Sequence, residues 1–153
     1  MTELVQADIL SEIDPDKLTL ILHGCNCFHM MGAGIAGYLA HKYPAVLEAD
    51  RKTPKGDLNK LGTYSIAKLT PLLYVFNCYT QYHGGAQAKS IHIRKCLAQL
   101  REEMGLVCVR SSPDLIDIRS PQIGCGIGGL NWAEVEPIFE QYLADMPYRI
   151  FYK

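Results

Sequence analysis

Two glycine-rich segments carry the residue types and spacing best suited to binding a phosphorylated ligand. Residues 31–37 read MGAGIAG and residues 124–129 read GCGIGG, and each segment leads into a region with helical character. Glycine allows the backbone to come close to a phosphate, and the free N–H groups at a helix start donate hydrogen bonds to it. Either segment alone could be a simple turn. Together they predict two loops that hold a diphosphate from opposite sides.

The first glycine segment contains the pattern G-x-G-x-x-G, which also occurs in dinucleotide-binding Rossmann folds. There the pattern directly follows a strand, and an acidic residue ends a second strand about 20 residues later. Here the apolar strand ends at Leu22, ten residues before Gly32, and no such acidic strand end follows. The chain also lacks the Walker pattern G-x-x-x-x-G-K-[ST]. The sequence therefore argues against NAD-dependent hydride transfer and Walker-type NTP hydrolysis, but not against a phosphate-binding loop.

Three polar residues stand near the expected ends of strands. Asp8 follows a short strand-like segment, where it could cap a turn or accept a hydrogen bond from an exocyclic amine such as that of adenine. His23 and Asn26 lie where the second strand is expected to end, just before the first glycine segment. An asparagine could bind a ribose hydroxyl there, and a histidine could act as acid, base or nucleophile, or be a hydrogen-bonded structural residue. Their position favours function.

The cysteines do not form a recognisable metal site. Cys25 and Cys27 have His23 and His29 nearby, but C-x-C is not the usual zinc spacing and no second pair follows. We therefore predict no metal. Of the six cysteines, three lie in or beside apolar segments, which favours reduced thiols over disulfides (Cys78, Cys96, Cys108).

Composition indicates one ordinary globular domain spanning residues 1–153, since domains average about 150 residues. Hydrophobic residues make up 48% of the chain, and the net charge of −1 disfavours a sequence-specific nucleic-acid or anionic-membrane partner. The most apolar windows are only strand-length, so no membrane span is expected. The N-terminal MTEL carries an acid where a secretory signal would carry lysine or arginine. We therefore expect a cytoplasmic protein.

Apolar runs of strand length alternate with helical stretches. The predicted strands are residues 3–6, 18–22, 63–68, 72–78, 106–110, 115–119 and 148–152. Several are apolar at consecutive positions, which suits a sheet covered on both faces. The predicted helices are residues 34–43, 44–52, 87–104 and a last one from Trp132, with Asn131 as its N-cap and Pro137 in its first two turns. Residues 51–62 are expected to be the most mobile. This order predicts a three-layer α/β/α sandwich with a mostly parallel or mixed sheet.

Three motifs together resemble the macro domain family. They are QADI at residues 6–9, HGCNC at 23–27 with GAGIA at 32–36, and PQIGCGIGGLNW at 121–132. The resemblance covers nearly the whole chain. It implies an α/β fold with a central six-stranded mixed sheet, and a cleft for ADP-ribose at the strand ends.

The resemblance also implies roles for individual residues. It places Asp8 on the adenine amine, Ile9 near the base, and Phe151 or its neighbour Tyr152 against the adenine ring. Asn26 and Tyr79 would orient the distal ribose. The diphosphate and distal ribose would lie between two walls, one made by Met31, Gly32, Ala33, Gly34 and Ile35, the other by Gly124, Cys125, Gly126, Ile127 and Gly128.

Within the family, the chain looks most like the ADP-ribose-1''-phosphate phosphatases. Relatives that remove ADP-ribose from glutamate or DNA use a lysine after the fourth strand, where this chain reads CYTQY at residues 78–82. The glutamate-directed enzyme also uses an aspartate where Gly128 stands. The resemblance therefore implies release of phosphate from ADP-ribose-1''-phosphate, with His23 as the catalytic group and no cofactor. Two alternatives stay open: a non-catalytic reader of ADP-ribose, and an ester hydrolase for ADP-ribosylated protein that uses a substrate-assisted water.

Overall fold

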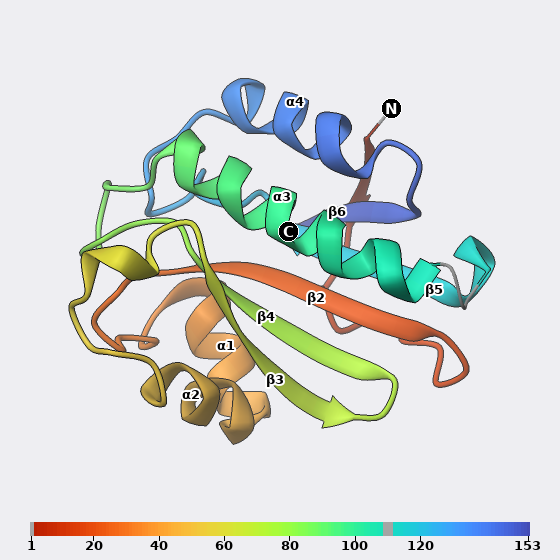
Figure 1. Cartoon of the computed structure of the whole chain (residues 1–153), viewed down its shortest axis with the longest axis horizontal. Helices are drawn as coiled ribbons and strands as arrows, with labels where there is room; N and C mark the ends of the chain where they lie inside the picture. The colour runs from red at the N-terminus through yellow and green to blue at the C-terminus, as the bar shows by residue number, and fades with distance from the viewer. Residues whose placement is uncertain (1, 109–111) are drawn as a thin grey trace.

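A six-stranded mixed sheet forms the centre of the molecule in the computed structural model, which describes residues 2–108 and 112–153 (Figure 1). The strand order is β1-β6-β5-β2-β4-β3, and only β3 runs antiparallel to its neighbour. This confirms the predicted fold class. The strands are β1 (Glu3–Gln6), β2 (Leu18–Cys25), β3 (Tyr64–Thr70), β4 (Leu73–Tyr79), β5 (Ile116–Pro121) and β6 (Tyr148–Tyr152).

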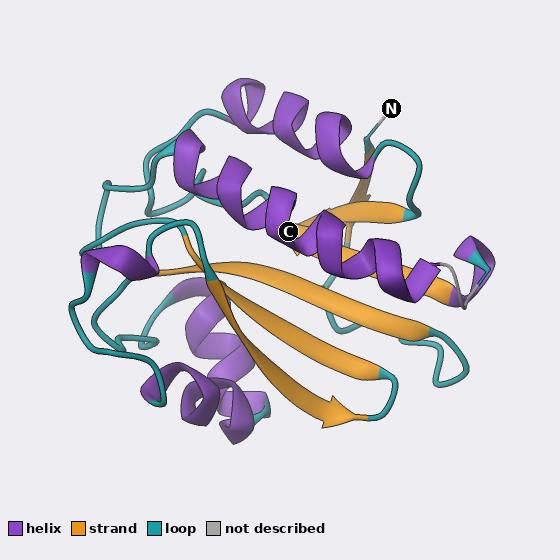
Figure 2. Ribbon diagram, viewed as in Figure 1, coloured by secondary structure: helices purple, strands orange, loops and turns teal. Residues whose placement is uncertain are grey.

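Helices cover both faces of this sheet, and Figure 2 shows the resulting three layers. One face carries α1 (Gly34–Lys42) and α2 (Pro44–Arg51), the other α3 (Ser90–Cys108) and α4 (Trp132–Leu143). Side chains of β2 alternate between the two apolar cores: Leu20 and Leu22 pack toward α3 and α4, and Ile21 toward α1 and α2. The consecutive apolar residues of this strand thus reflect burial on both sides. No helix within the described residues is long and apolar enough to cross a membrane.

The strand predicted at residues 106–110 is wrong for the part that the structure describes. Residues 106–108 continue α3, while residues 109 and 110 lie outside the described residues. A short apolar run has no periodicity of its own, so it suits a buried strand and the end of an amphipathic helix equally well. The predicted helix at 87–104 therefore begins later and ends later than expected.

Two other sequence expectations concern local structure. Asn131 does cap α4, since its Oδ1 accepts a hydrogen bond from Ala133 N at 3.1 Å. The segment 51–62 includes a short 3-10 helix, η1 (Leu58–Lys60), and Lys60 Nζ is buried and donates to Cys27 O at 3.3 Å. A second 3-10 helix, η2 (Pro113–Leu115), precedes β5.

The parallel strands bring four loops to one edge of the sheet. β1, β2, β4, β5 and β6 all run in the same direction, so the segments after their carboxyl ends meet there. The loops after β2 and β5 hold the two glycine segments. Ligands of open α/β sheets bind at this edge, which directs attention to these loops.

Candidate functional site

A continuous cleft lies at the carboxyl edge of the sheet. Its larger part is a cavity of about 490 Å³ between the loops after β2, β4 and β5. A smaller part, of about 270 Å³, lies between the loop after β1, helix α1 and the end of β6. Both parts are lined by Gly34, Ile35 and Pro121, so they join. The two glycine segments that the sequence predicts as walls therefore meet along one elongated cleft, although not all of their residues line it.

One wall of the cleft is the start of α1. Its N-cap, Ala33, has no side chain that could bond the first amides of the helix. The N–H groups of Gly34, Ile35 and Ala36 belong to the first turn, where helical amides have no intrahelical acceptor, and all three residues line the cleft. Unpaired amides and the positive end of the helix dipole make this wall suitable for an anion.

The opposite wall is the second glycine loop. Gly124 has a φ of +76°, which favours glycine, and its carbonyl accepts a hydrogen bond from Leu130 N at 2.8 Å. A Cβ on Gly128 would lie 2.7 Å from Gly124 O, so a side chain there would break the loop. The N–H groups of Gly126, Ile127 and Gly128 bond no acceptor among the described residues. They remain free to donate to a ligand.

Asp8 lies at one end of the cleft as a fixed acceptor. Its Oδ1 accepts from Leu10 N at 2.8 Å, and its Oδ2 accepts from the Tyr38 hydroxyl at 2.6 Å. These two bonds lower the pKa of Asp8, and the same contact raises the pKa of Tyr38 to about 12. Asp8 is therefore a carboxylate at neutral pH. Ile9, Phe151 and Tyr152 line the same end of the cleft, and the adenine contacts that the family resemblance implies for them stay predictions.

Sequence reasoning missed Tyr38 and Arg119, which shape this end. Arg119 is buried in β5, where it pairs with Asp117 at 2.9 Å and donates to the carbonyls of Ile9 and Glu12. It thereby holds the loop that follows Asp8. A charge inside an apolar strand must be paired, so Arg119 could have been noticed, but its partners could not.

The other end of the cleft is formed by uncharged groups. Asn26 Oδ1 accepts from Phe28 N at 2.9 Å, and its Nδ2 donates to Met30 O at 3.0 Å, which uses one of its two hydrogens. Thr80 and Gln81, after β4, line the same part. Within the described residues, the larger cavity is lined by no Asp, Glu, Lys, Arg or His. Cys25 also lines it, and burial raises the pKa of its thiol.

His23 does not reach this cleft, so its predicted direct catalytic role is contradicted by the geometry. Its side chain is 0% exposed and lies on the α1 and α2 side of the sheet. Its Nε2 lies 2.6 Å from Asn77 Oδ1. Asn77 Nδ2 donates to Val46 O and Ser65 Oγ, so Oδ1 must accept, and His23 carries its proton on Nε2. Burial lowers the pKa of His23 to about 4.

The cause of that error is the length of β2. The strand continues to Cys25, three residues beyond the predicted end at Leu22. His23 is therefore an internal strand residue whose side chain enters a core, while Gly24 and Asn26 line the cleft.

Tyr79 is likewise not placed as predicted. It is 0% exposed, and its hydroxyl donates to Asp50 Oδ1 at 2.7 Å beneath α2. The side chains of Met31 and Cys125 pack into the two apolar cores rather than the cleft. The remaining predicted residues line one or both parts of the cleft, and their individual roles stay predictions (Asp8, Ile9, Asn26, Gly32, Ala33, Gly34, Ile35, Gly124, Gly126, Ile127, Gly128, Phe151).

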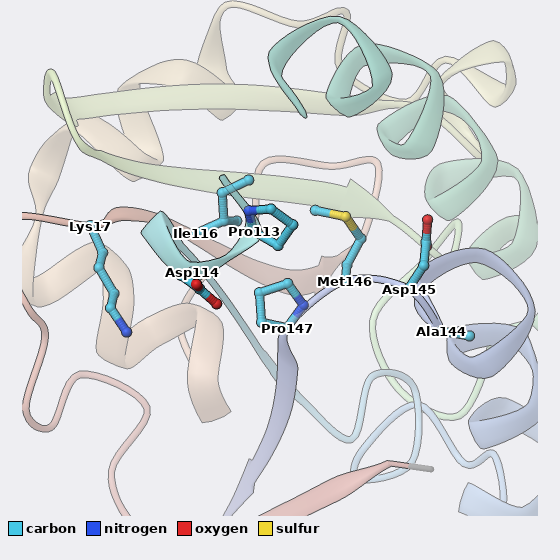
Figure 3. A pocket seen from close by; sticks show the side chains of 8 residues that line it. All are labelled: Lys17, Pro113, Asp114, Ile116, Ala144, Asp145, Met146 and Pro147. Atoms are coloured by element: carbon cyan, nitrogen blue, oxygen red, sulfur yellow. The ribbon is translucent and has the colours of Figure 1, made fainter. Parts of the chain in front are cut away.

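A separate hollow of about 420 Å³ lies at the opposite edge of the sheet (Figure 3). It is lined by residues just before β2, β5 and β6, including Lys17, Asp114 and Pro147. These are the amino ends of parallel strands, away from the glycine loops. No group of three or more His, Cys, Asp or Glu in the described parts of the chain could hold a metal ion. The cleft at the carboxyl edge is therefore the candidate site.

Sequence comparisons relate the chain to an uncharacterized phage protein and to enzymes named for reactions of ADP-ribose derivatives. An uncharacterized 17.5 kDa protein of Enterobacteria phage T4 is 40% identical over 130 residues, covering 82% of this chain and 81% of that protein. The ADP-ribose 1''-phosphate phosphatase of Saccharomyces cerevisiae is 26% identical over 156 residues, covering 86% and 88%. The DNA ADP-ribosyl glycohydrolase of Mycobacterium tuberculosis is 28% identical over 130 residues, covering 83% of this chain but 35% of that enzyme.

Solved structures agree with this fold. A Bacteroides thetaiotaomicron protein superposes with a TM-score of 0.80 at 23% identity, covering 99% of both chains. Thermosipho africanus DarTG, solved in complex with ADP-ribose, superposes with a TM-score of 0.72 at 21% identity, covering 97% of this chain and 40% of that one. At such identities the likeness shows the fold alone. The family model named Macro domain matches residues 22–139, and the chain therefore belongs to the macro domain family.

Proposed function

We propose that the cleft binds ADP-ribose, with the adenine beside Asp8 and the distal ribose toward Asn26. The observation that carries this proposal is the pair of backbone walls. Unpaired amides at the start of α1 and in the loop 124–129 line opposite sides of the larger cavity. This arrangement suits a diphosphate because the donors need not reorganise to meet its oxygens. The Asp8 carboxylate adds an acceptor where an adenine amine would lie.

We further propose that the protein hydrolyses ADP-ribose-1''-phosphate. Water attacks the terminal phosphorus, the bond between phosphorus and the C1'' oxygen breaks, and that oxygen takes a proton delivered from the water. The products are ADP-ribose and inorganic phosphate. The loop amides would stabilise the negative charge that develops on the phosphoryl oxygens. The named activity of the yeast relative supports this reaction, and the buried, neutral His23 takes no part in it.

A second candidate function is recognition of ADP-ribose without turnover. It is favoured by the larger cavity, where the described lining residues supply no carboxylate, imidazole or ammonium group for acid or base catalysis. Lysine-dependent removal of ADP-ribose is less well supported, because residues 80–85, which follow β4, contain no lysine.

A paired binding and turnover assay tests these functions. Calorimetry with ADP-ribose measures binding, and incubation with ADP-ribose-1''-phosphate measures phosphate and ADP-ribose released in equal amounts. We expect both binding and release. Binding without release from this substrate or from ADP-ribosylated protein would leave the reader function, and release of ADP-ribose from protein alone would indicate the ester hydrolase.

Gly126 provides the control that ties both readouts to the cleft. No atom lies within 4 Å of where its Cβ would be, and its φ is not positive, so a side chain fits without strain. Gly126→Glu should abolish binding and turnover because it adds a carboxylate beside the diphosphate. Gly126→Gln, of the same size but uncharged, should lose less. Full binding by Gly126→Glu, measured by calorimetry on a variant with unchanged circular dichroism, would disprove the proposed diphosphate position.

A further inference from the structure

Gln81 is held at the distal end of the cleft by two hydrogen bonds to its own loop. Its Nε2 donates to His83 O at 2.7 Å and to Gly85 O at 3.0 Å. Both partners are carbonyl oxygens, which only accept. The amide nitrogen must therefore face them, and the orientation of the side-chain amide is fixed by chemistry.

This orientation leaves Gln81 Oε1 as an unused acceptor. It bonds no donor among the described residues, although Gln81 itself lines the larger cavity. Both amide hydrogens are already engaged, so Gln81 can offer a ligand only a lone pair. A ligand group that meets it must carry a hydrogen.

Asn26 lines the same cavity as Gln81, on the neighbouring segment after β2. Thr80 N donates to Cys25 O at 3.1 Å, and Cys27 N donates to Tyr82 O at 2.9 Å. Residues 26 and 81 are thus the two positions between the same pair of backbone bonds. Asn26 has its Oδ1 bonded to Phe28 N, and one of its Nδ2 hydrogens bonds no acceptor among the described residues. The same cavity is therefore lined by one side chain with a donor to offer and one with an acceptor to offer.

We propose that Gln81 is a specificity-determining residue whose Oε1 accepts a hydrogen bond from a hydroxyl of the distal ribose. A hydroxyl carries a hydrogen, so it can donate to the free oxygen of Gln81. An anionic group would be repelled by the amide oxygen at this position. The inference rests on the proposed binding of ADP-ribose. It adds that the group bound by Gln81 is a hydroxyl of the distal ribose.

The test compares ADP-ribose with ADP, which lacks the distal ribose, by calorimetry on wild type and two variants. Gln81→Met removes the acceptor and both donors. It should lower ADP-ribose affinity about 3- to 10-fold, the range for losing one neutral hydrogen bond. ADP affinity should change less than about twofold, which also shows that the cleft is folded.

Gln87→Met is the matched control for loop bracing. Gln87 Oε1 accepts from His83 N at 3.2 Å, so it supports the same loop, but it does not line the cleft. The Gln87→Met variant should have the same ratio of ADP-ribose affinity to ADP affinity as wild type. The inference is overturned if Gln81→Met weakens both ligands equally or neither, or if Gln87→Met matches its selective loss. Wild type that binds no ADP-ribose would instead overturn the proposed function, and the inference with it.

Discussion

Replacement of His23 by glutamine should make the protein's stability less sensitive to mild acid. The buried imidazole is neutral in the folded chain, because desolvation lowers the pKa of His23 to about 4, whereas an unfolded histidine titrates near about 6.5. Below about pH 6.5 the unfolded chain therefore binds more protons than the folded chain. The free energy of unfolding must fall as pH decreases from about 6.5 to about 4.

The size of this effect follows from the two pKa values. Each unit of difference is worth about 1.4 kcal/mol, and integration between about pH 7 and about pH 5 gives a loss of about 2 kcal/mol for wild type. The imidazole is hydrogen-bonded to Asn77, and its pKa is lowered by burial in the core rather than by any group of the cleft. Glutamine can donate to Asn77 Oδ1 as Nε2 does now, but it does not titrate.

Urea unfolding at several pH values between about 5 and 7 measures the prediction. The informative quantity is the slope of the free energy of unfolding against pH, not its absolute value, since any cost of repacking around the new side chain is the same at each pH. His92→Gln is the comparison variant. Burial also lowers the pKa of His92, but this side chain is less buried, so its replacement should change the pH dependence of stability less than His23→Gln does. Parallel loss of stability in wild type and His23→Gln would refute the buried, neutral imidazole. His23→Gln should also keep most of any phosphate release, since His23 does not line the cleft.

Two further predictions concern the ligand. ADP-ribose should raise the melting temperature more than AMP at equal concentration, because AMP cannot occupy both walls and the distal end; equal shifts in a thermal scan would contradict the two-walled diphosphate site. Asp8→Asn should weaken ADP-ribose binding by about 1.5–3 kcal/mol, the range for a hydrogen bond to a charged partner, as measured by calorimetry. The same substitution should also reduce the preference for ADP-ribose over its inosine analogue, which lacks the exocyclic amine. An unchanged preference would mean that Asp8 bonds only Leu10 and Tyr38 and not the ligand.

Several features of the site were predictable from neighbouring residues alone. The glycine segments were found because the backbone conformation of such a loop depends mainly on its own residues. Gly124 has a positive φ, and α1 begins within the first glycine segment. Asp8 was found because it directly follows a strand. The three-layer order was found because β2 is apolar at consecutive positions, and such a strand must be covered on both faces.

Other features depend on contacts between residues far apart in the chain. A strand ends where its last partner ends, and β4 pairs with β2 as far as Cys25 and Tyr79, so both His23 and Tyr79 are drawn into the sheet. Apolar periodicity stops at Leu22 and cannot show this. Tyr38 meets Asp8 across 30 positions of the sequence, and Arg119 meets Ile9 across 110.

The sequence by itself thus determined the family resemblance, the layers of the fold and the two glycine loops that line the cleft, because each depends on short-range backbone preferences or on the burial pattern of single elements. Only the tertiary structure decided which polar side chains reach the cleft. His23 and Tyr79 are buried and do not line the cleft, whereas Tyr38 and Gln81, which the sequence did not single out, do. The physical reason is that a side chain's exposure depends on what packs over it, and here the helix α2 and the strand β4, distant in sequence, cover the histidine.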